Sequence, residues 1–466
     1  MGRLWRRRRD YCATIWAVGV LGVVFKLRTA GRTFNLNHTT SFVTRFNKAF
    51  GDKIKKRKFK YVSWNIDAMS TPFQLEAYLN RDNLPAGSEV EVFLIIRAMP
   101  TKQAAAAVQT YRRKVHMAFV IDVSGSMRGE KLETAKEAII RRYQRDLDDD
   151  DILSLITFSD NAKIVVDSAT KKSAKNVEAT IRGVQCEAAT NLYEGIERAV
   201  DVVSKTPPGY LRVMVIATDG KPTAGVTDPA EIVRLVQEAR QRHNVTTFVY
   251  GIGDDYDLKL CDDMAKAGGG TMKYASKPNE LEGLTQMLAT MIKSTVAPKL
   301  ALDLIPEAGV EIREASLLSP RAMVLDPRSK PWDVGMVGAN DIIIATFKLK
   351  IGPKPEGQQK IAAVALGAVT KDVEAQFVQE APFAEAHPEA RIYHVVGVRV
   401  ANIVEKSKNG KNPADEYRLL DSLLGTQEAH DLMLRDPYFA RLVNVTQGTK
   451  VEDAKTRVDR LTTPMK

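Results

Sequence analysis

Short, continuously apolar runs alternate with amphipathic helical patterns between Val115 and about Thr295, and this alternation restricts the fold more than any other feature. The strand-like runs occupy residues 115–121, 152–158, 211–217 and 245–251, and the helical patterns occupy residues 131–145, 192–204, 229–243 and 257–267. Runs that are apolar throughout are typical of strands covered by helices on both faces. The alternation therefore predicts an α/β domain with a doubly wound, mostly parallel sheet, and the turn at residues 159–161 predicts one antiparallel edge hairpin.

The segments on both sides of this domain carry β-strand patterns instead. Residues 89–96 are β-rich and follow a Pro-Ala-Gly turn, and residues 298–378 contain further short strand-like runs separated by Pro and Gly. Because a β-rich segment flanks the α/β domain on each side, we expect the two flanks to form one β-sandwich that the α/β domain interrupts. The expected domains are residues 61–113 plus 296–380 for the sandwich and residues 114–295 for the α/β domain.

The C-terminal region, residues 381–466, is predicted to be helical. Residues 390–406 carry an apolar stripe at helical spacing, an Asn-Gly-Lys-Asn-Pro break follows, and residues 414–424 resume the pattern. This arrangement predicts a helical hairpin.

The net charge of +11 is concentrated at the N-terminus. Residues 1–60 contain 16 Lys and Arg residues against two Asp residues, so the rest of the chain is slightly negative. Bulk charge therefore gives no indication of specific nucleic-acid binding by the folded part. We expect residues 1–60 to be a basic, poorly ordered segment; weak contact with a membrane surface, and an export signal or anchor built on the apolar run 13–25, are the alternatives.

The three cysteines are far apart in the sequence and show no zinc-binding spacing. This usage favours a reducing compartment, so a cytoplasmic location is the expectation. Membrane association or export through residues 1–60 is the alternative.

Oxygen-bearing side chains lie in loops next to three of the predicted elements of the α/β domain. Asp122, Ser124 and Ser126 come directly after the first strand, Thr190 opens a helix, and Asp219 follows another core strand. Loops at the carboxyl ends of parallel strands meet at one sheet edge, where open α/β sheets bind ligands. An all-oxygen donor set suits Mg²⁺, with Mn²⁺ or Ca²⁺ as alternatives. If the three hydroxyls coordinate directly and the carboxylates act through water, the cation remains electrophilic and attracts a carboxylate of a partner protein.

These residues closely resemble the metal-ion-dependent adhesion site of von Willebrand factor A domains. Residues 131–136, 191–195, 249–253 and 268–270 are also similar to segments of that family. The resemblance implies a metal-dependent adhesion or scaffold module. The strand–insert–strand layout further resembles inter-α-trypsin inhibitor heavy-chain-like proteins and their bacterial relatives.

Each candidate also has a simpler structural interpretation. Ser, Thr and Asp after a strand commonly make turns and helix caps, so Thr190 could merely cap its helix. The acidic run 148–151 lacks calcium-loop spacing and is interpreted as a solvated turn. Arg128, beside the motif, is either a surface charge or a contact for an acidic partner.

The sequence contains no Walker loop, HExxH or GxSxG motif, and no histidine in a triad context. We therefore predict a binding protein and no enzyme, with no catalytic residues. Two further hypotheses remain open: an accessory subunit of an AAA+ ATPase assembly, which is a role of some bacterial von Willebrand A proteins, and a membrane-associated or secreted adhesin.

Overall fold

The computed structural model describes residues 27–29, 32–34, 72–110, 112–172, 176–277 and 279–462, and its chain forms two compact units, residues 1–66 and 67–466. In the first unit, β1 (Leu27–Thr29) pairs antiparallel with β2 (Arg32–Phe34). The apolar run 13–25 lies outside the described residues, so the alternatives stated for it remain predictions. Among the helices that are described, none is long and apolar enough to cross a membrane.

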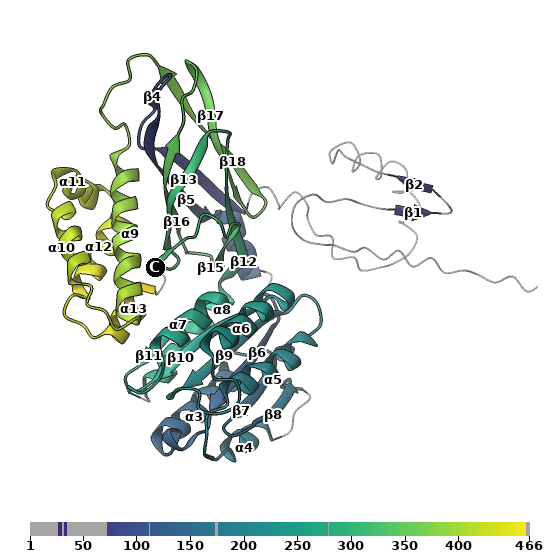
Figure 1. Ribbon diagram of the computed structural model, residues 1–466. Helices are drawn as coiled ribbons and strands as arrows, with labels where there is room; N and C mark the ends of the chain where they lie inside the picture. The colour runs from purple at the N-terminus through teal and green to yellow at the C-terminus, as the bar shows by residue number, and fades with distance from the viewer. Residues whose placement is uncertain are drawn as a thin grey trace, which may run out of the picture. The chain divides into compact units, whose positions relative to one another are not determined.

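A six-stranded sheet forms the centre of the α/β domain, in the order β11-β10-β9-β6-β7-β8 (Figure 1). Neighbouring strands are parallel except β8, which pairs antiparallel with β7 at one edge, so the predicted fold class and the edge hairpin are confirmed. The strands are β6 (Val115–Asp122), β7 (Ile152–Phe158), β8 (Ala162–Ala169), β9 (Leu211–Thr218), β10 (Val245–Ile252) and β11 (Gly269–Ala275).

Helices cover both faces of this sheet because successive side chains of a strand point to opposite faces. On β6, Val120 packs with the helices of one layer, whereas Phe119 and Ile121 pack with those of the other. The first layer contains α5 (Leu192–Ser204), α6 (Pro229–His243) and α7 (Leu258–Ala267). The second contains α3 (Glu130–Arg145), α4 (Val177–Arg182) and α8 (Glu280–Lys293).

Two five-stranded sheets follow, in the orders β15-β12-β17-β18-β4 and β14-β13-β16-β5-β3. Each sheet contains strands from before and from after the α/β domain, and both contribute to one hydrophobic core. We refer to these two sheets together as the β domain. Its strands are β3 (Phe73–Leu79), β4 (Asn83–Pro85), β5 (Val90–Pro100), β12 (Thr295–Pro306), β13 (Val310–Ser319), β14 (Met323–Val324), β15 (Trp332–Gly338), β16 (Ile343–Ile351), β17 (Gly357–Leu366) and β18 (Val369–Val378).

The segment between β5 and β6, for which the sequence analysis predicted no helix, contains the helix α2 (Lys102–Thr110). Its four consecutive alanines have the highest intrinsic helix propensity of any residue, which a reading based on apolar periodicity does not detect.

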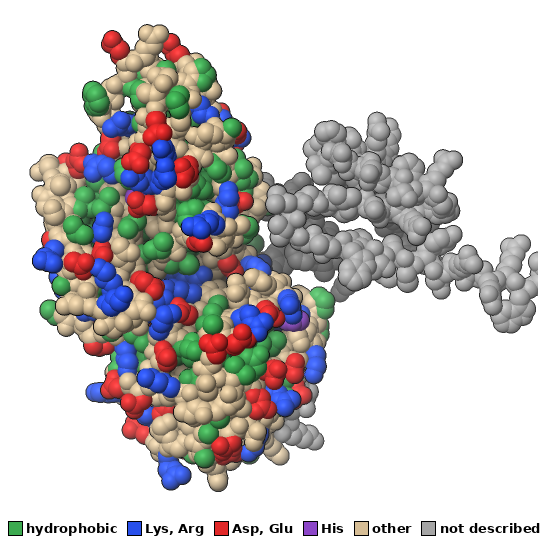
Figure 2. Space-filling model, viewed as in Figure 1, with side chains coloured by type: hydrophobic (Ala, Val, Ile, Leu, Met, Phe, Trp, Pro, Cys, Tyr) green, Lys and Arg blue, Asp and Glu red, His purple; other side chains and the backbone are tan. Residues whose placement is uncertain are grey.

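The C-terminal region is helical, as predicted, but extends beyond a hairpin. The predicted pair corresponds to α9 (Pro388–Lys408) and α10 (Ala414–Leu424). Three more helices follow: α11 (Gln427–Arg435), α12 (Pro437–Gly448) and α13 (Ala454–Thr462). The helix α9 packs on the β14-β13-β16-β5-β3 sheet, and α13 reaches β11 of the α/β domain. On the face seen in Figure 2, acidic and basic side chains are interspersed over this unit.

Candidate metal centre

Three loops meet at the carboxyl edge of the six-stranded sheet. We call residues 123–129 the first loop, residues 183–191 the second loop and residues 219–228 the third loop. The second loop is bound to the first by the Glu187 amide, which donates to the Val123 carbonyl at 2.7 Å, and to the third by the Thr223 amide, which donates to the Thr190 carbonyl at 3.0 Å. The backbone therefore holds the three loops together without help from a ligand.

Two buried carboxylates form the base of the site. Asp122, at the end of β6, and Asp219, directly after β9, are both 0% exposed. One oxygen of Asp122 accepts from the Ser124 amide at 2.9 Å, and the other accepts from the Thr218 hydroxyl at 2.8 Å. These bonds fix the Asp122 carboxylate to both of the strands that position the site.

The serine hydroxyls connect the two carboxylates. Ser124 Oγ lies 3.0 Å from Ser126 Oγ, and Ser126 Oγ donates to Asp219 Oδ1 at 2.8 Å. Ser124 is buried, whereas Ser126 is exposed, so the hydrogen-bonded chain runs from the interior to the surface.

Thr190 lies in the second loop and is buried. Its hydroxyl oxygen is 4.0 Å from the position that a Cβ on Gly220 would take, so it faces the third loop directly after Asp219. The cap of α5 is Asn191, whose side chain accepts from the Glu194 amide. Helix capping therefore does not explain Thr190, in contrast to the simpler interpretation of this residue.

Two further residues that contact the candidate carboxylates were not identified from the sequence. Thr218 orients Asp122, and Lys131, in the first turn of α3, donates from Nζ to Asp219 Oδ2 at 2.5 Å. The sequence does show that a basic residue, Lys131, closely follows the Asp-x-Ser-x-Ser motif. Its contact with Asp219 cannot be recognised in the sequence, because the two residues follow different strands of the sheet.

The electrostatics of the cluster favour a bound cation. Burial raises the pKa of Asp122, the charge of Asp219 raises it further, and the hydrogen bonds from Ser124 and Thr218 oppose this shift. Two adjacent carboxylates removed from water are stabilised by an additional positive charge. In the described part of the chain, no cluster of three or more His, Cys, Asp or Glu side chains is placed to hold a metal. The hydroxyl and carboxylate oxygens at the three loops are donors of the kind that a hard divalent cation prefers.

The acidic tract 148–151 is only partly the solvated turn that its sequence suggests. Residues 148–150 are exposed, but Asp151 is buried and accepts from the amides of Asp148, at 2.8 Å, and Val115, at 2.9 Å. It also pairs with Arg112 at 2.5 Å. Asp151 thus anchors the start of β6, which only the folded chain makes apparent.

Comparison with known proteins gives a family for the α/β domain. The von Willebrand factor type A domain model matches residues 116–287. Among curated proteins, an uncharacterized protein of Synechocystis sp. is 28% identical over 54% of this chain and 59% of its own length. Inter-alpha-trypsin inhibitor heavy chain H1 of Homo sapiens is 28% identical over 40% of this chain and 21% of its own length. The chain thus spans less than two thirds of these relatives.

Solved structures extend the similarity of fold beyond this domain. A von Willebrand factor type A protein from Catenulispora acidiphila superimposes with a TM-score of 0.63 at 17% identity, covering 85% of this chain and 97% of that one. The ArnB paralog VWA2 from Sulfolobus acidocaldarius gives a TM-score of 0.57 at 15% identity, covering 84% and 97%. Each of these two structures covers a much larger part of the chain than residues 116–287. The fold of the β domain and of the C-terminal helices therefore also has counterparts among solved structures. The chain therefore contains a von Willebrand factor type A domain, which the family model places at residues 116–287.

Proposed function

We propose that this chain is a metal-ion-dependent protein-binding module that captures a carboxylate of a partner protein through a divalent cation. Domains of the von Willebrand factor type A family are commonly metal-dependent interaction modules, and the matched residues include all five candidates. Ser124, Ser126 and Thr190 are the proposed ligands, and Asp122 and Asp219 are the carboxylates that orient them.

The observation that carries this proposal is the chain of hydroxyls between two fully buried carboxylates. Each carboxylate already accepts two hydrogen bonds or ion-pair contacts from the protein, so both are fixed in orientation. Fixed carboxylates can direct hydroxyl lone pairs toward a cation, much as outer partners orient ligands at other metal sites. The cation would supply an electrophilic position for a partner's carboxylate, and Ser126 would present it at the surface.

The same geometry argues for binding rather than hydrolysis. The hydroxyls and engaged carboxylates of the cluster include no group with an ordinary pKa near neutrality that could serve as a general base. Mg²⁺ is the cation we favour, with Mn²⁺ as a convenient probe of the same site.

Titration calorimetry of the chelator-treated full chain tests the proposal directly. We expect one Mg²⁺ or Mn²⁺ per chain, and we expect Ser126→Ala to weaken binding about tenfold or more. Ser126 is the best position to change because it is exposed, and Asp219 keeps its contact with Lys131 when the Ser126 hydroxyl is lost. Ser204→Ala, at the far end of α5, is the matched control and should bind like the wild type. Equal affinity in the wild type and Ser126→Ala would refute the assignment of the site.

A further inference from the structure

We propose that Lys131 sets the charge of the metal centre so that the cation is held tightly only together with a partner's carboxylate. This inference rests on the proposed function, because it concerns the same site. It assigns Lys131 a role as a positioning residue that couples cation binding to partner binding.

The contact of Lys131 with Asp219 is the first observation. Nζ of Lys131 donates to Asp219 Oδ2 at 2.5 Å, and the Lys131 side chain is 28% exposed beside a carboxylate that is 0% exposed. The ammonium also lies 3.6 Å from the position that a Cβ on Gly253 would take, at the end of β10. The positive charge is thus fixed between the third loop and the next strand of the sheet.

Asp219 is shared between Lys131 and the proposed ligands. Its Oδ1 accepts from Ser126, while its Oδ2 accepts from Lys131. A cation held by Ser126 and the Lys131 ammonium would therefore draw on the same carboxylate. Two positive charges that depend on one buried anion oppose each other, and the exclusion of water from Asp219 increases this effect.

The formal charge of the site, with and without the cation, decides whether the site attracts a further anion. Asp122, Asp219 and Lys131 together carry a charge of −1, and a divalent cation changes this to +1. Without Lys131 the loaded site would be neutral and would gain little from a further anion. With Lys131 it keeps one positive charge, which one partner carboxylate neutralises. Cation and carboxylate should therefore strengthen each other's binding by the same factor, as thermodynamic linkage requires.

The test measures Mn²⁺ affinity of the full chain by calorimetry, with and without acetate as the carboxylate probe. Lys131→Met removes the charge, and Lys131→Gln removes it while keeping a hydrogen-bond donor. We expect both variants to bind Mn²⁺ about tenfold more tightly than the wild type and to lose the acetate dependence. Lys131→Arg, which keeps the charge, should behave like the wild type. Lys221→Met removes an exposed charge from the third loop and is the matched control.

A second readout needs no metal. In EDTA, Lys131→Met should melt at a lower temperature than the wild type because Asp219 loses its counter-charge, and saturating Mn²⁺ should remove this difference. If the wild type binds Mn²⁺ and both uncharged variants match it in affinity and acetate dependence, this inference is wrong while the metal site stands. If neither the wild type nor any Lys131 variant binds Mn²⁺, the proposed function fails as well.

Discussion

His116 is a buried histidine of β6 whose two ring nitrogens both have partners. Nδ1 lies 2.6 Å from the Thr206 hydroxyl, and Nε2 lies 2.9 Å from the Ser154 hydroxyl. The Thr206 hydroxyl donates its proton to the Val203 carbonyl, so His116 Nδ1 must be the donor and Nε2 the acceptor. The site therefore suits the neutral imidazole. Burial lowers the pKa of His116 to about 4, and the charge of Arg212 contributes to this shift.

This pKa predicts a loss of stability in mild acid. Between about pH 6.5 and pH 4 the unfolded chain binds a proton at this position and the folded chain does not, so the free energy of unfolding falls as the pH falls. The full effect is about 3 kcal/mol, at roughly 1.4 kcal/mol for each pKa unit. Urea unfolding at several pH values should show a steeper dependence for the wild type than for His116→Gln. Parallel curves for the two proteins would contradict this role for His116.

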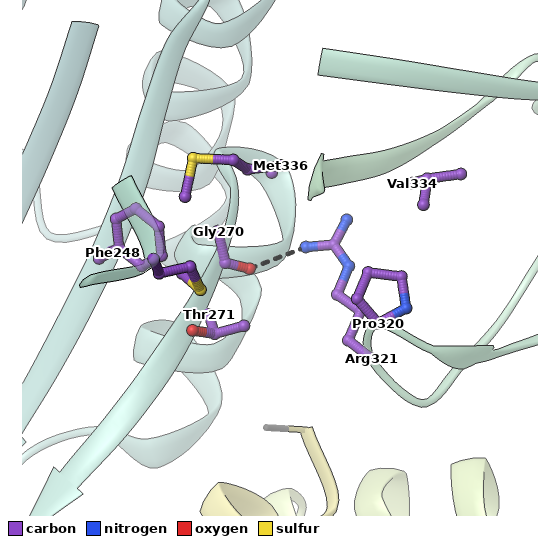
Figure 3. A pocket seen from close by; sticks show the side chains of 9 residues that line it. Phe248, Gly270, Thr271, Pro320, Arg321, Val334 and Met336 are labelled. Carbon is purple, nitrogen blue, oxygen red and sulfur yellow. Dashed lines mark hydrogen bonds between the residues drawn. The ribbon is translucent and has the colours of Figure 1, made fainter. Parts of the chain in front are cut away.

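At the scale of elements, charged side chains join α6 of the α/β domain to β15 of the β domain. Arg240 contacts Asp333 at 2.8 and 3.1 Å and donates to the Pro298 carbonyl at 2.9 Å. Arg321, which is also buried, donates to the Gly270 carbonyl of β11 at 3.0 Å beside a small cavity (Figure 3). Interactions of this kind fix the α/β domain to the strands that flank it.

Breaking this junction should be costly. Arg240→Met removes the ion-pair partner of the partly buried Asp333, and we expect a loss of about 3 kcal/mol in the free energy of unfolding, measured with urea. Arg234 on the same helix pairs with Glu231 at the exposed surface and provides a matched control. Arg234→Met should cost less than about 1 kcal/mol because water screens that pair. Equal losses in the two variants would show that the junction contributes no special stability.

At the scale of the whole molecule, the chain leaves and re-enters the β domain at neighbouring positions. The Arg113 side chain donates to the Val296 carbonyl at 3.3 Å, although the two residues lie on opposite sides of the α/β domain in the sequence. An inserted domain whose two ends lie close together can be replaced by a short linker. We therefore propose that the β domain folds without the α/β domain.

Replacing residues 115–295 by a Gly/Ser linker, with the C-terminal helices retained, should leave a soluble β-rich protein that unfolds cooperatively in urea. Residues 296–380 alone should not fold, because β16 then lacks β5 and β18 lacks β4. Circular dichroism and urea titration of both proteins provide the measurement. Cooperative unfolding of residues 296–380 alone would show that the two flanks are independent domains.

The basic N-terminal unit permits a separate prediction. Deleting residues 1–60 should abolish sedimentation with anionic vesicles and retention of DNA at low salt, since each basic residue near an anionic membrane contributes about 1 kcal/mol. Binding of Mn²⁺ should be unchanged, because all five candidate residues lie in the other unit. Added salt should reproduce the effect of the deletion in the full chain. Vesicle binding that survives the deletion would place the basic surface elsewhere.

Local patterning predicted the elements closest to the site. The strands β6, β7, β9 and β10 and the helices α3, α5, α6 and α7 lie within one residue of their predicted bounds at each end. Continuous apolar runs and capping residues such as Asp228 and Asp257 carry this information, and both act over only a few residues. The three site loops could be identified for the same reason, since each directly follows a strand or opens a helix.

The local residue pattern was enough to predict the strands and helices around the site and the loops that carry its oxygen-bearing side chains. The strand order, the assignment of each flanking strand to one of the two β sheets, and the pairing of Lys131 with Asp219 became apparent only in the folded chain. The tertiary structure also decided that Asp151 is buried while its acidic neighbours are exposed. These features depend on contacts between residues far apart in the chain. Their free energy comes from desolvation and packing, which the local pattern of residues does not specify.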